Sequence, residues 1–237
     1  MVRFPKRFFI FIALATTAWS CKQNQSAEDI SVDMNEEKQK ISYSIGVNIG
    51  SGLKSSGLKD DLDTEIISKA IQDVLADKEL LCSQEEAGQN IQTYMMAKQN
   101  KDNQENLEKG QKFLEENAKI EGIVSLENGL QYQVLNEGNG EKPTTEDKVK
   151  VHYHGTLIDG TVFDSSVERG EPATFGVTQV IKGWTEILQL MSVGSKWKVF
   201  IPTELAYSTN VRPGGPIPAN ATLIFEIELL EIVKESK

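Results

Sequence analysis

The chain has 237 residues, of which 39% are hydrophobic and 25% are charged. This is the ordinary composition of a globular protein that can bury a core. Acidic residues outnumber basic ones by 35 to 25, so the formal net charge is −10. Because such a chain repels phosphate backbones, nucleic acid is excluded as an expected partner. Cys21 and Cys82 lack metal-ligand spacing. The composition therefore predicts no metal or other cofactor.

The first twenty residues have the features of an export signal. A basic start is followed by an apolar run from Phe8 to Ala18, which is too short to span a bilayer as a stable helix. Two processing routes are open: cleavage before Cys21 with lipidation of that residue, or ordinary cleavage near Ala18. The run up to Cys21 is similar to a bacterial lipobox, although Ala18 and Trp19 depart from the usual residues. We favour lipidation, which predicts an exported protein of the periplasm or outer membrane, anchored to the membrane by lipid at Cys21.

Residues 21–35 are polar and acidic, which predicts a flexible tether. Helical periodicity starts near Glu36. An apolar stripe then recurs at every fourth residue, at Ile41, Ile45, Ile49 and Leu53. Asp63 can cap a second helix, because its carboxylate can accept bonds from the free amides of a first turn. The apolar faces of these short helices exceed what they can hide, so we expect this region to pair with a second copy as a homodimer.

A third and much longer helix is predicted from Ser83 to about Ile120. Ser83 and Glu86 have the spacing of a capping box. A helix of this length measures about 57 Å. Its two ends carry apolar side chains, whereas the segment from Lys98 to Asn106 is wholly polar. We therefore expect a linking helix with a solvated middle, which completes a helical domain of residues 36–121.

Beyond Gly122 the hydrophobic period falls from about 3.6 residues to 2, which is typical of strands. Apolar residues alternate with polar ones after Gly129, around Val151 and again from Thr222 to Ile232. Asp159-Gly160 predicts a hairpin turn, because glycine takes the positive φ that a tight turn needs. The segment from Trp184 to Met191 is long enough for one short helix. Residues 122–237 are therefore expected to form an antiparallel sheet curled around that helix.

Three short runs set apolar side chains beside a few polar groups: Val151–Gly155, Val162–Ser166 and Val180–Trp184. Such runs are how a small apolar pocket with few hydrogen-bond donors is built. With these motifs, the segment from Gly129 to Val233 resembles an FKBP-type peptidyl-prolyl isomerase domain. Three helices before it are similar to the macrophage infectivity potentiator branch of that family, whose members dimerise through their amino-terminal helices. The resemblance implies an α+β fold: a helical dimerisation domain, a linking helix and the isomerase domain.

The resemblance also implies the pocket residues, position by position. Those matched to catalytic residues are Tyr153, Phe163, Asp164, Ile181, Trp184, Tyr207 and Phe225. Val180 and Ile217 match substrate-binding residues, and Arg169 is grouped with them because it is expected to orient Asp164. Trp184 is expected as the floor under the prolyl ring, with the Tyr207 hydroxyl and the Ile181 amide as donors. Two positions depart from the family: Ala173 stands where some members have phenylalanine, which opens one wall, and Ser208 stands where glycine is usual.

Two functions fit this pattern. The first is a prolyl isomerase that assists the folding of exported proteins, acts on unfolded chains with Xaa-Pro bonds and binds macrolide inhibitors such as rapamycin. The second is a non-catalytic holdase that only docks prolines. His152 and His154 share one strand face as a metal pair would, but a solvated face is the better interpretation. Every expected pocket residue follows Gly122, so a fragment starting there is predicted to keep turnover of a short peptide.

Overall fold

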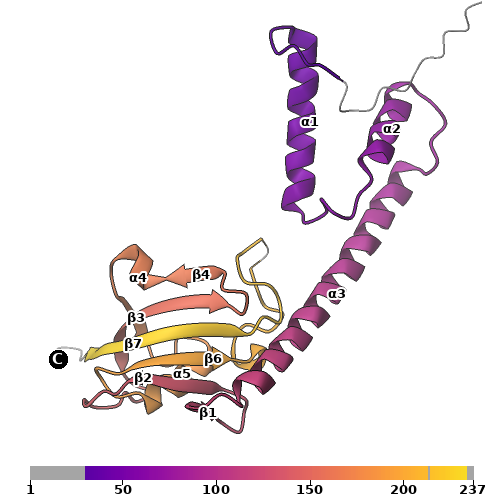
Figure 1. Cartoon of the computed structure of the whole chain (residues 1–237). Coiled ribbons are helices and arrows are strands. Elements are labelled where there is room, and N and C mark those ends of the chain that lie inside the picture. Colours follow the sequence, from indigo (N-terminus) through magenta and orange to yellow (C-terminus); the bar gives the residue numbers. More distant parts are fainter. Residues whose placement is uncertain (1–29, 213, 234–237) are drawn as a thin grey trace, which may run out of the picture. The chain divides into compact units, whose positions relative to one another are not determined.

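The computed structural model of the chain describes residues 30–212 and 214–233 (Figure 1). The predicted export signal, Cys21 and the tether as far as residue 29 lie outside the described residues. The elements form two compact units that divide between Leu81 and Cys82. The long helix therefore belongs to the same unit as the sheet, whereas the sequence suggested a boundary near residue 121. Among the described helices, none combines the length and the apolar character needed to cross a membrane.

The first unit contains the helices α1 (Glu37–Ser55) and α2 (Thr64–Leu75). Asp63 caps α2 as predicted, because its carboxylate accepts hydrogen bonds from the amides of Glu65 and Ile66 at 2.9 and 3.2 Å. Neither helix contains a buried residue. Ile41 and Ile45, which belong to the predicted stripe, are 55% and 53% exposed.

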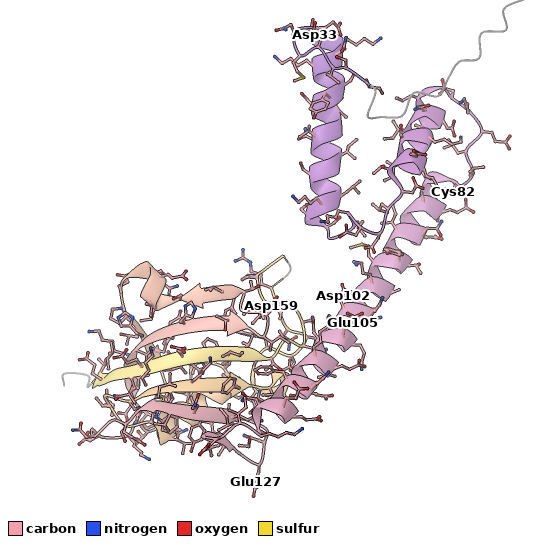
Figure 2. All side chains as sticks on the ribbon, viewed as in Figure 1. Asp33, Cys82, Asp102, Glu105, Glu127 and Asp159 are labelled. Atoms are coloured by element: carbon pink, nitrogen blue, oxygen red, sulfur yellow. The ribbon has the colours of Figure 1, made fainter. Side chains whose placement is uncertain are left out.

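The helix α3 (Gln84–Asn117) opens the second unit and has the predicted capping box. The Ser83 hydroxyl accepts from the Glu86 amide at 3.2 Å, and the Glu86 carboxylate accepts from the Ser83 amide at 2.8 Å. Asp102 and Glu105 lie along the polar middle of α3 (Figure 2). The Glu105 carboxylate forms ion pairs with Lys101 and Lys109, one turn away on either side.

The rest of the second unit is an antiparallel sheet with one helix packed against it (Figure 1). The strand order is β1-β2-β6-β7-β3-β4, and β5 pairs with β3. The strands are β1 (Ile123–Ser125), β2 (Gln131–Asn136), β3 (Lys148–Leu157), β4 (Val162–Ser165), β5 (Ala173–Gly176), β6 (Lys196–Ile201) and β7 (Leu223–Val233). The helices are α4 (Ser166–Arg169), α5 (Lys182–Leu190) and the 3-10 helix η2 (Thr203–Leu205). The predicted α+β fold is confirmed, with α5 as the expected short helix.

The core lies between α5 and the sheet. Alternate residues of β3 and β7 are buried, as expected of strands with one face against a core. Ile187 and Leu188 of α5 are fully buried against them. Gly183 allows the close approach, because a Cβ atom at this position would lie only 2.6 Å from a methyl carbon of Ile201.

The predicted hairpin turn joins β3 and β4. Gly160 has φ of +86°, and the Asp159 carboxylate accepts from the Thr161 amide at 2.9 Å. Figure 2 shows Asp159 at the tip of this turn. Glycine is therefore required here by the left-handed backbone conformation.

The carboxyl-terminal part of α3 packs on the outer face of β2 and β6. Phe113 contacts Phe200 with ring centroids 6.0 Å apart. The side-chain amide of Asn117 donates to the side-chain oxygen of Gln131 at 2.8 Å. The side-chain amide of Gln131 donates in turn to the backbone carbonyl of Leu114 at 2.9 Å. Asn117 and Gln131 are both buried. The helix is therefore an integral layer of the second unit.

Candidate active site

A cavity of about 400 Å³ opens between α5 and the inner face of the sheet. It is lined by Tyr153, Phe163, Asp164, Phe175, Gln179, Val180, Ile181, Trp184, Tyr207, Ile217 and Phe225. All nine residues matched to the family's pocket therefore lie together around one cavity. The tenth predicted site residue, Arg169, bonds Asp164 and Tyr153 and is not among the lining residues.

Trp184 forms the floor of the cavity. Its indole is 4% exposed and makes edge-to-face contacts with three neighbouring rings. The centroids of Tyr153, Phe175 and Phe225 lie 5.4, 5.8 and 5.2 Å from that of Trp184. Edge-to-face pairs at such distances add to the stability that area burial alone provides. Each ring therefore restrains the orientation of its neighbours.

Gly155 lets two of the walls meet. In the register of the sheet, Gly155 lies between Asp164 of β4 and Phe225 of β7. A Cβ atom on Gly155 would lie 2.7 Å from the Phe163 ring and 2.9 Å from the Phe225 ring. Because glycine leaves this space open, Phe163 and Phe225 stack edge to face at 5.3 Å.

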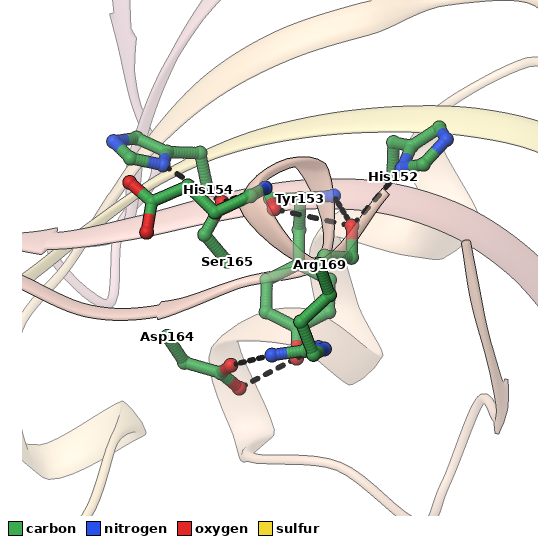
Figure 3. A network of polar contacts seen from close by, with 8 residues as sticks. His152, Tyr153, His154, Asp164, Ser165 and Arg169 are labelled. Carbon is green, nitrogen blue, oxygen red and sulfur yellow. Dashed lines mark hydrogen bonds and ion pairs between the residues drawn. The ribbon is translucent and has the colours of Figure 1, made fainter. Parts of the chain in front are cut away.

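One polar network enters this apolar cavity (Figure 3). The Tyr153 hydroxyl donates to one Asp164 oxygen at 2.5 Å, and Arg169 forms an ion pair with the other. Arg169 also donates to the Tyr153 hydroxyl at 2.8 Å and lies over its ring. Burial would raise the pKa of Asp164, but hydrogen bonds from Tyr153 and Arg169 outweigh it and hold that pKa below its ordinary value. Asp164 is therefore a fixed carboxylate at neutral pH.

The same network raises the pKa of Tyr153, mainly because the hydroxyl is partly buried and donates to a carboxylate. Tyr153 is therefore a neutral donor at neutral pH. Because hydrogen bonds and the ion pair hold Asp164 on two sides, its carboxylate is set in one orientation toward the cavity.

The short helix α4 supplies Arg169 to this network. It begins where the Ser165 hydroxyl accepts from the Glu168 amide at 3.1 Å, and it ends at Gly170, which has φ of +79°. The cap and the glycine confine α4 to a single turn directly after β4. Asp164 and Arg169 are therefore brought together by local sequence, five residues apart.

His152 and His154 lie on the opposite side of β3 from the Tyr153 ring (Figure 3). Their Nδ1 atoms contact different hydroxyls, those of Ser166 and Ser165, at 3.1 and 3.0 Å. Among the described residues, no group of three or more His, Cys, Asp or Glu side chains is arranged to hold a metal ion. The two histidines thus take part in separate hydrogen bonds with the serines where β4 meets α4.

Two lining residues were missed by sequence reasoning. The first is Phe175, which lies on the same face of β5 as Ala173 and contacts Tyr153 and Trp184. The period of two along β5 could have indicated that Phe175 faces the cavity. Gln179 follows β5 in a turn in which its amide donates to the Gly176 carbonyl at 2.9 Å. No hydrophobic pattern marks such a residue.

Comparison with known proteins agrees with this fold and cavity. Residues 139–230 match the family described as FKBP-type peptidyl-prolyl cis-trans isomerase. Residues 38–134 match the domain amino terminal to FKBP-type peptidyl-prolyl isomerase. Both parts of the chain are thus similar to parts of one kind of enzyme.

Relatives that match most of the chain belong to the same family. The outer membrane protein MIP of Legionella longbeachae is 45% identical over 208 residues, which cover 85% of this chain and 88% of that protein. FkpA of Aeromonas hydrophila, named an FKBP-type peptidyl-prolyl cis-trans isomerase, is 44% identical over 94% of this chain and 86% of its own length. The crystal structure of FkpA from Escherichia coli superimposes with a TM-score of 0.69 at 39% identity, covering 85% of this chain and 99% of that one. The chain therefore belongs to the FKBP-type peptidyl-prolyl cis-trans isomerases that carry the amino-terminal helical domain, and it is an enzyme of that class.

Proposed function

We propose that this enzyme accelerates rotation about Xaa-Pro bonds in exported proteins, and that the cavity above Trp184 is its active site. The observation that carries the proposal is an apolar cavity, walled by aromatic rings, into which one fixed carboxylate network projects. Rotation about a peptide bond has an intrinsic barrier of about 18 to 20 kcal/mol, because amide resonance must be broken. The protein has only to bind the twisted amide better than the planar one.

In this proposal the prolyl ring lies on Trp184, against the walls formed by Phe163 and Phe225. The twisted amide is less dipolar than the planar amide, so it loses less solvation when it enters an apolar site. The aromatic walls thus favour the transition state over the ground state. Val180 and Ile217 extend the apolar contact along the substrate.

The polar groups of the cavity hold the substrate backbone. The Tyr207 hydroxyl and the Ile181 amide act as donors to substrate carbonyls. Ile181 is the N-cap of α5, so its amide takes no part in the bonding within that helix. Asp164 lies beside the reacting carbonyl, and Arg169 acts by orienting Asp164 and not by touching substrate. Rotation about the amide bond transfers no proton, so Asp164 is not required to act as a general base.

The proposed site predicts that Asp164→Ala and Tyr207→Phe each lower kcat/KM for a short Xaa-Pro peptide. A decrease of about tenfold is expected if each change removes one hydrogen bond worth about 1.4 kcal/mol in the transition state. Circular dichroism should report an unchanged fold. Glu171→Ala is the matched control, because Glu171 is an exposed acidic residue outside the cavity lining. Rapamycin should inhibit the unmodified protein.

Unchanged turnover in both site variants would contradict the assignment of these residues. Absence of turnover in the unmodified protein, with peptide still bound at the cavity, would favour the non-catalytic holdase.

We infer further that the protein is a homodimer formed through residues 36 to about 97. The supporting observation is the exposed stripe of α1, together with the apolar surface of α2 on which Ile66 and Val74 are 65% and 57% exposed. Contiguous apolar surface of this kind is typical of a protein interface. Each dimer then presents two isomerase sites to one client.

We propose that the enzyme is exported to the periplasm or outer membrane and lipidated at Cys21. The support is the signal-like start of the sequence and the similarity to a relative named as an outer membrane protein, MIP of Legionella longbeachae. The test is Cys21→Ala followed by membrane fractionation and mass spectrometry of the mature amino terminus. Release into the soluble fraction is expected, and retention in the membrane fraction would contradict the lipid anchor.

A further inference from the structure

The loop between η2 and β7 carries two lining residues of the cavity, Tyr207 and Ile217. Its base, which we call the loop stem, consists of residues 207–210 and 217–222. The two sides of the stem are joined where the Asn220 amide donates to the Ser208 carbonyl at 2.8 Å. Tyr207 thus precedes Ser208, which is hydrogen-bonded to Asn220 on the other side of the stem.

The stem has a demanding backbone conformation. Ser208 and Asn220 have φ of +50° and +58°, in the left-handed region that side chains disfavour. Residues persist in such conformations when their surroundings hold them in place. The first hold on the stem comes from η2, where the Thr203 carbonyl accepts from both the Ser208 amide and the Ser208 hydroxyl, at 3.1 and 3.2 Å.

The second hold on the stem comes from α3. The Asn106 side-chain amide donates to the Ala219 carbonyl at 3.1 Å. The Asn220 side-chain amide donates in return to the Asn103 carbonyl at 3.2 Å. These residues are separated by 113 and 117 positions in the sequence, so only the tertiary fold brings them together.

One helical turn further along, α3 touches the end of the stem. Gly110 is buried, and an added Cβ atom would overlap the Thr222 hydroxyl and lie 3.3 Å from the Thr222 Cβ. Thr222 is itself buried. The glycine therefore sets how closely α3 approaches the stem.

We propose that Asn103, Asn106 and Gly110 of α3 position the loop stem, and through it Tyr207 and Ile217, for substrate binding. Asn106 and Gly110 are positioning residues, because they touch the stem and not the cavity. The connection runs from Asn106 to the Ala219 carbonyl, two residues from Ile217. This inference rests on the proposed role of the cavity as the substrate site.

The first test is Asn106→Ala in the full chain. Loss of one hydrogen bond, worth about 0.5 to 1.5 kcal/mol, corresponds to about two- to twelvefold. We expect KM for an Xaa-Pro peptide and Kd for rapamycin to rise within that range, while kcat changes less than about twofold. Hydrogen exchange of the Ser208 and Asn220 amides should become faster. The control is Gln104→Ala, since Gln104 is exposed on the same helix and bonds Glu108 only one turn away.

A second pair of variants tests the same proposal independently, even if the Asn106→Ala protein does not fold. Gly110→Ala should push α3 from the stem and weaken rapamycin binding several-fold, because its Cβ atom would overlap Thr222. Gly110→Ala combined with Thr222→Ala should restore binding to within about twofold of Thr222→Ala alone, since the overlapping hydroxyl is gone.

Unchanged rapamycin affinity and unchanged exchange of the stem amides in Asn106→Ala would overturn the proposal. So would failure of Thr222→Ala to rescue Gly110→Ala. If the unmodified protein binds rapamycin but does not turn over peptide, the proposed function fails, while the exchange and binding measurements still decide the role of α3.

Discussion

Gly155 matters because the absence of a side chain at this position lets two walls of the cavity meet. It lies between Asp164 and Phe225 in the sheet, and the rings of Phe163 and Phe225 occupy the space where a Cβ atom would be. A methyl group at this position forces two pocket walls apart. Overpacking of a close-packed site typically costs about 1 to 3 kcal/mol.

We therefore predict that Gly155→Ala lowers stability by about 1 to 3 kcal/mol and, under native conditions, lowers kcat/KM more than stability alone explains. The added methyl group displaces the walls that hold the prolyl ring. Urea unfolding and peptide turnover are the measurements. Gly88→Ala adds the same methyl group where no atom lies within 4 Å, and it should leave turnover unchanged. A Gly155→Ala protein with full activity would show that the walls can move apart without loss.

Arg169 and the two histidines show how position decides what a charged or polar side chain does. Arg169 was expected to orient Asp164, and its guanidinium bonds both Asp164 and Tyr153 while lying outside the cavity lining. His152 and His154 contact Ser166 and Ser165 on the other face of β3. Only Asp164 and Tyr153 bring this polar network to the cavity lining.

At the scale of elements, α3 belongs to the same compact unit as the sheet of the isomerase domain. Its carboxyl-terminal part covers Phe200, which is only 4% exposed, and completes the buried bonds of Gln131. The compact unit accordingly begins at Cys82. The expectation that a fragment starting at Gly122 keeps turnover of a short peptide rests on the lining residues, which all follow Gly122.

We now predict that a fragment starting at Asp102 is more stable than one starting at Gly122. Burial of a phenylalanine contributes about 1.5 to 3 kcal/mol, so removal of α3 from Phe200 should cost at least that amount. Urea midpoints of the two fragments measure the difference, with peptide turnover at low temperature as a second readout. The Asp102 fragment should match the full chain in turnover per site. Equal midpoints would mean that the packing of α3 on the sheet adds little.

At the scale of the whole molecule, the exposed stripe of α1 is the feature that the isomerase domain does not explain. If it forms the dimer interface, a charge placed in it must separate the two copies, because a buried unpaired charge is costly. The short-peptide activity of each site should not depend on this interface. Refolding of a large client should, because two linked sites raise the local concentration of sites around it.

We predict that Ile45→Asp converts a dimer to a monomer in sedimentation experiments. Turnover of a short peptide per site should stay the same, while catalysis of a refolding protein limited by a proline bond should decrease. Ser51→Asp is the control, because Ser51 is an exposed residue of the same helix on the face opposite the stripe. A dimeric Ile45→Asp protein, or one that refolds the client equally well, would contradict the proposed interface.

The sequence by itself determined the features that depend on neighbouring residues. Capping at Asp63 and Ser83, the helical period of α1 and the alternation in β3 and β7 all act within a few residues, so each could be predicted. The pocket residues followed from motifs whose order and spacing resemble one family. Nine of the ten predicted site residues line the cavity, and the order and spacing of those motifs is what indicated them.

Only the tertiary structure decided which side chains from separate elements meet. Phe175 and Gln179 line the cavity although no motif marked them. The attachment of α3 to the loop stem joins Asn106 to Ala219 across 113 positions. Such contacts depend on how separate elements pack in space, and no local period or short motif records that distance.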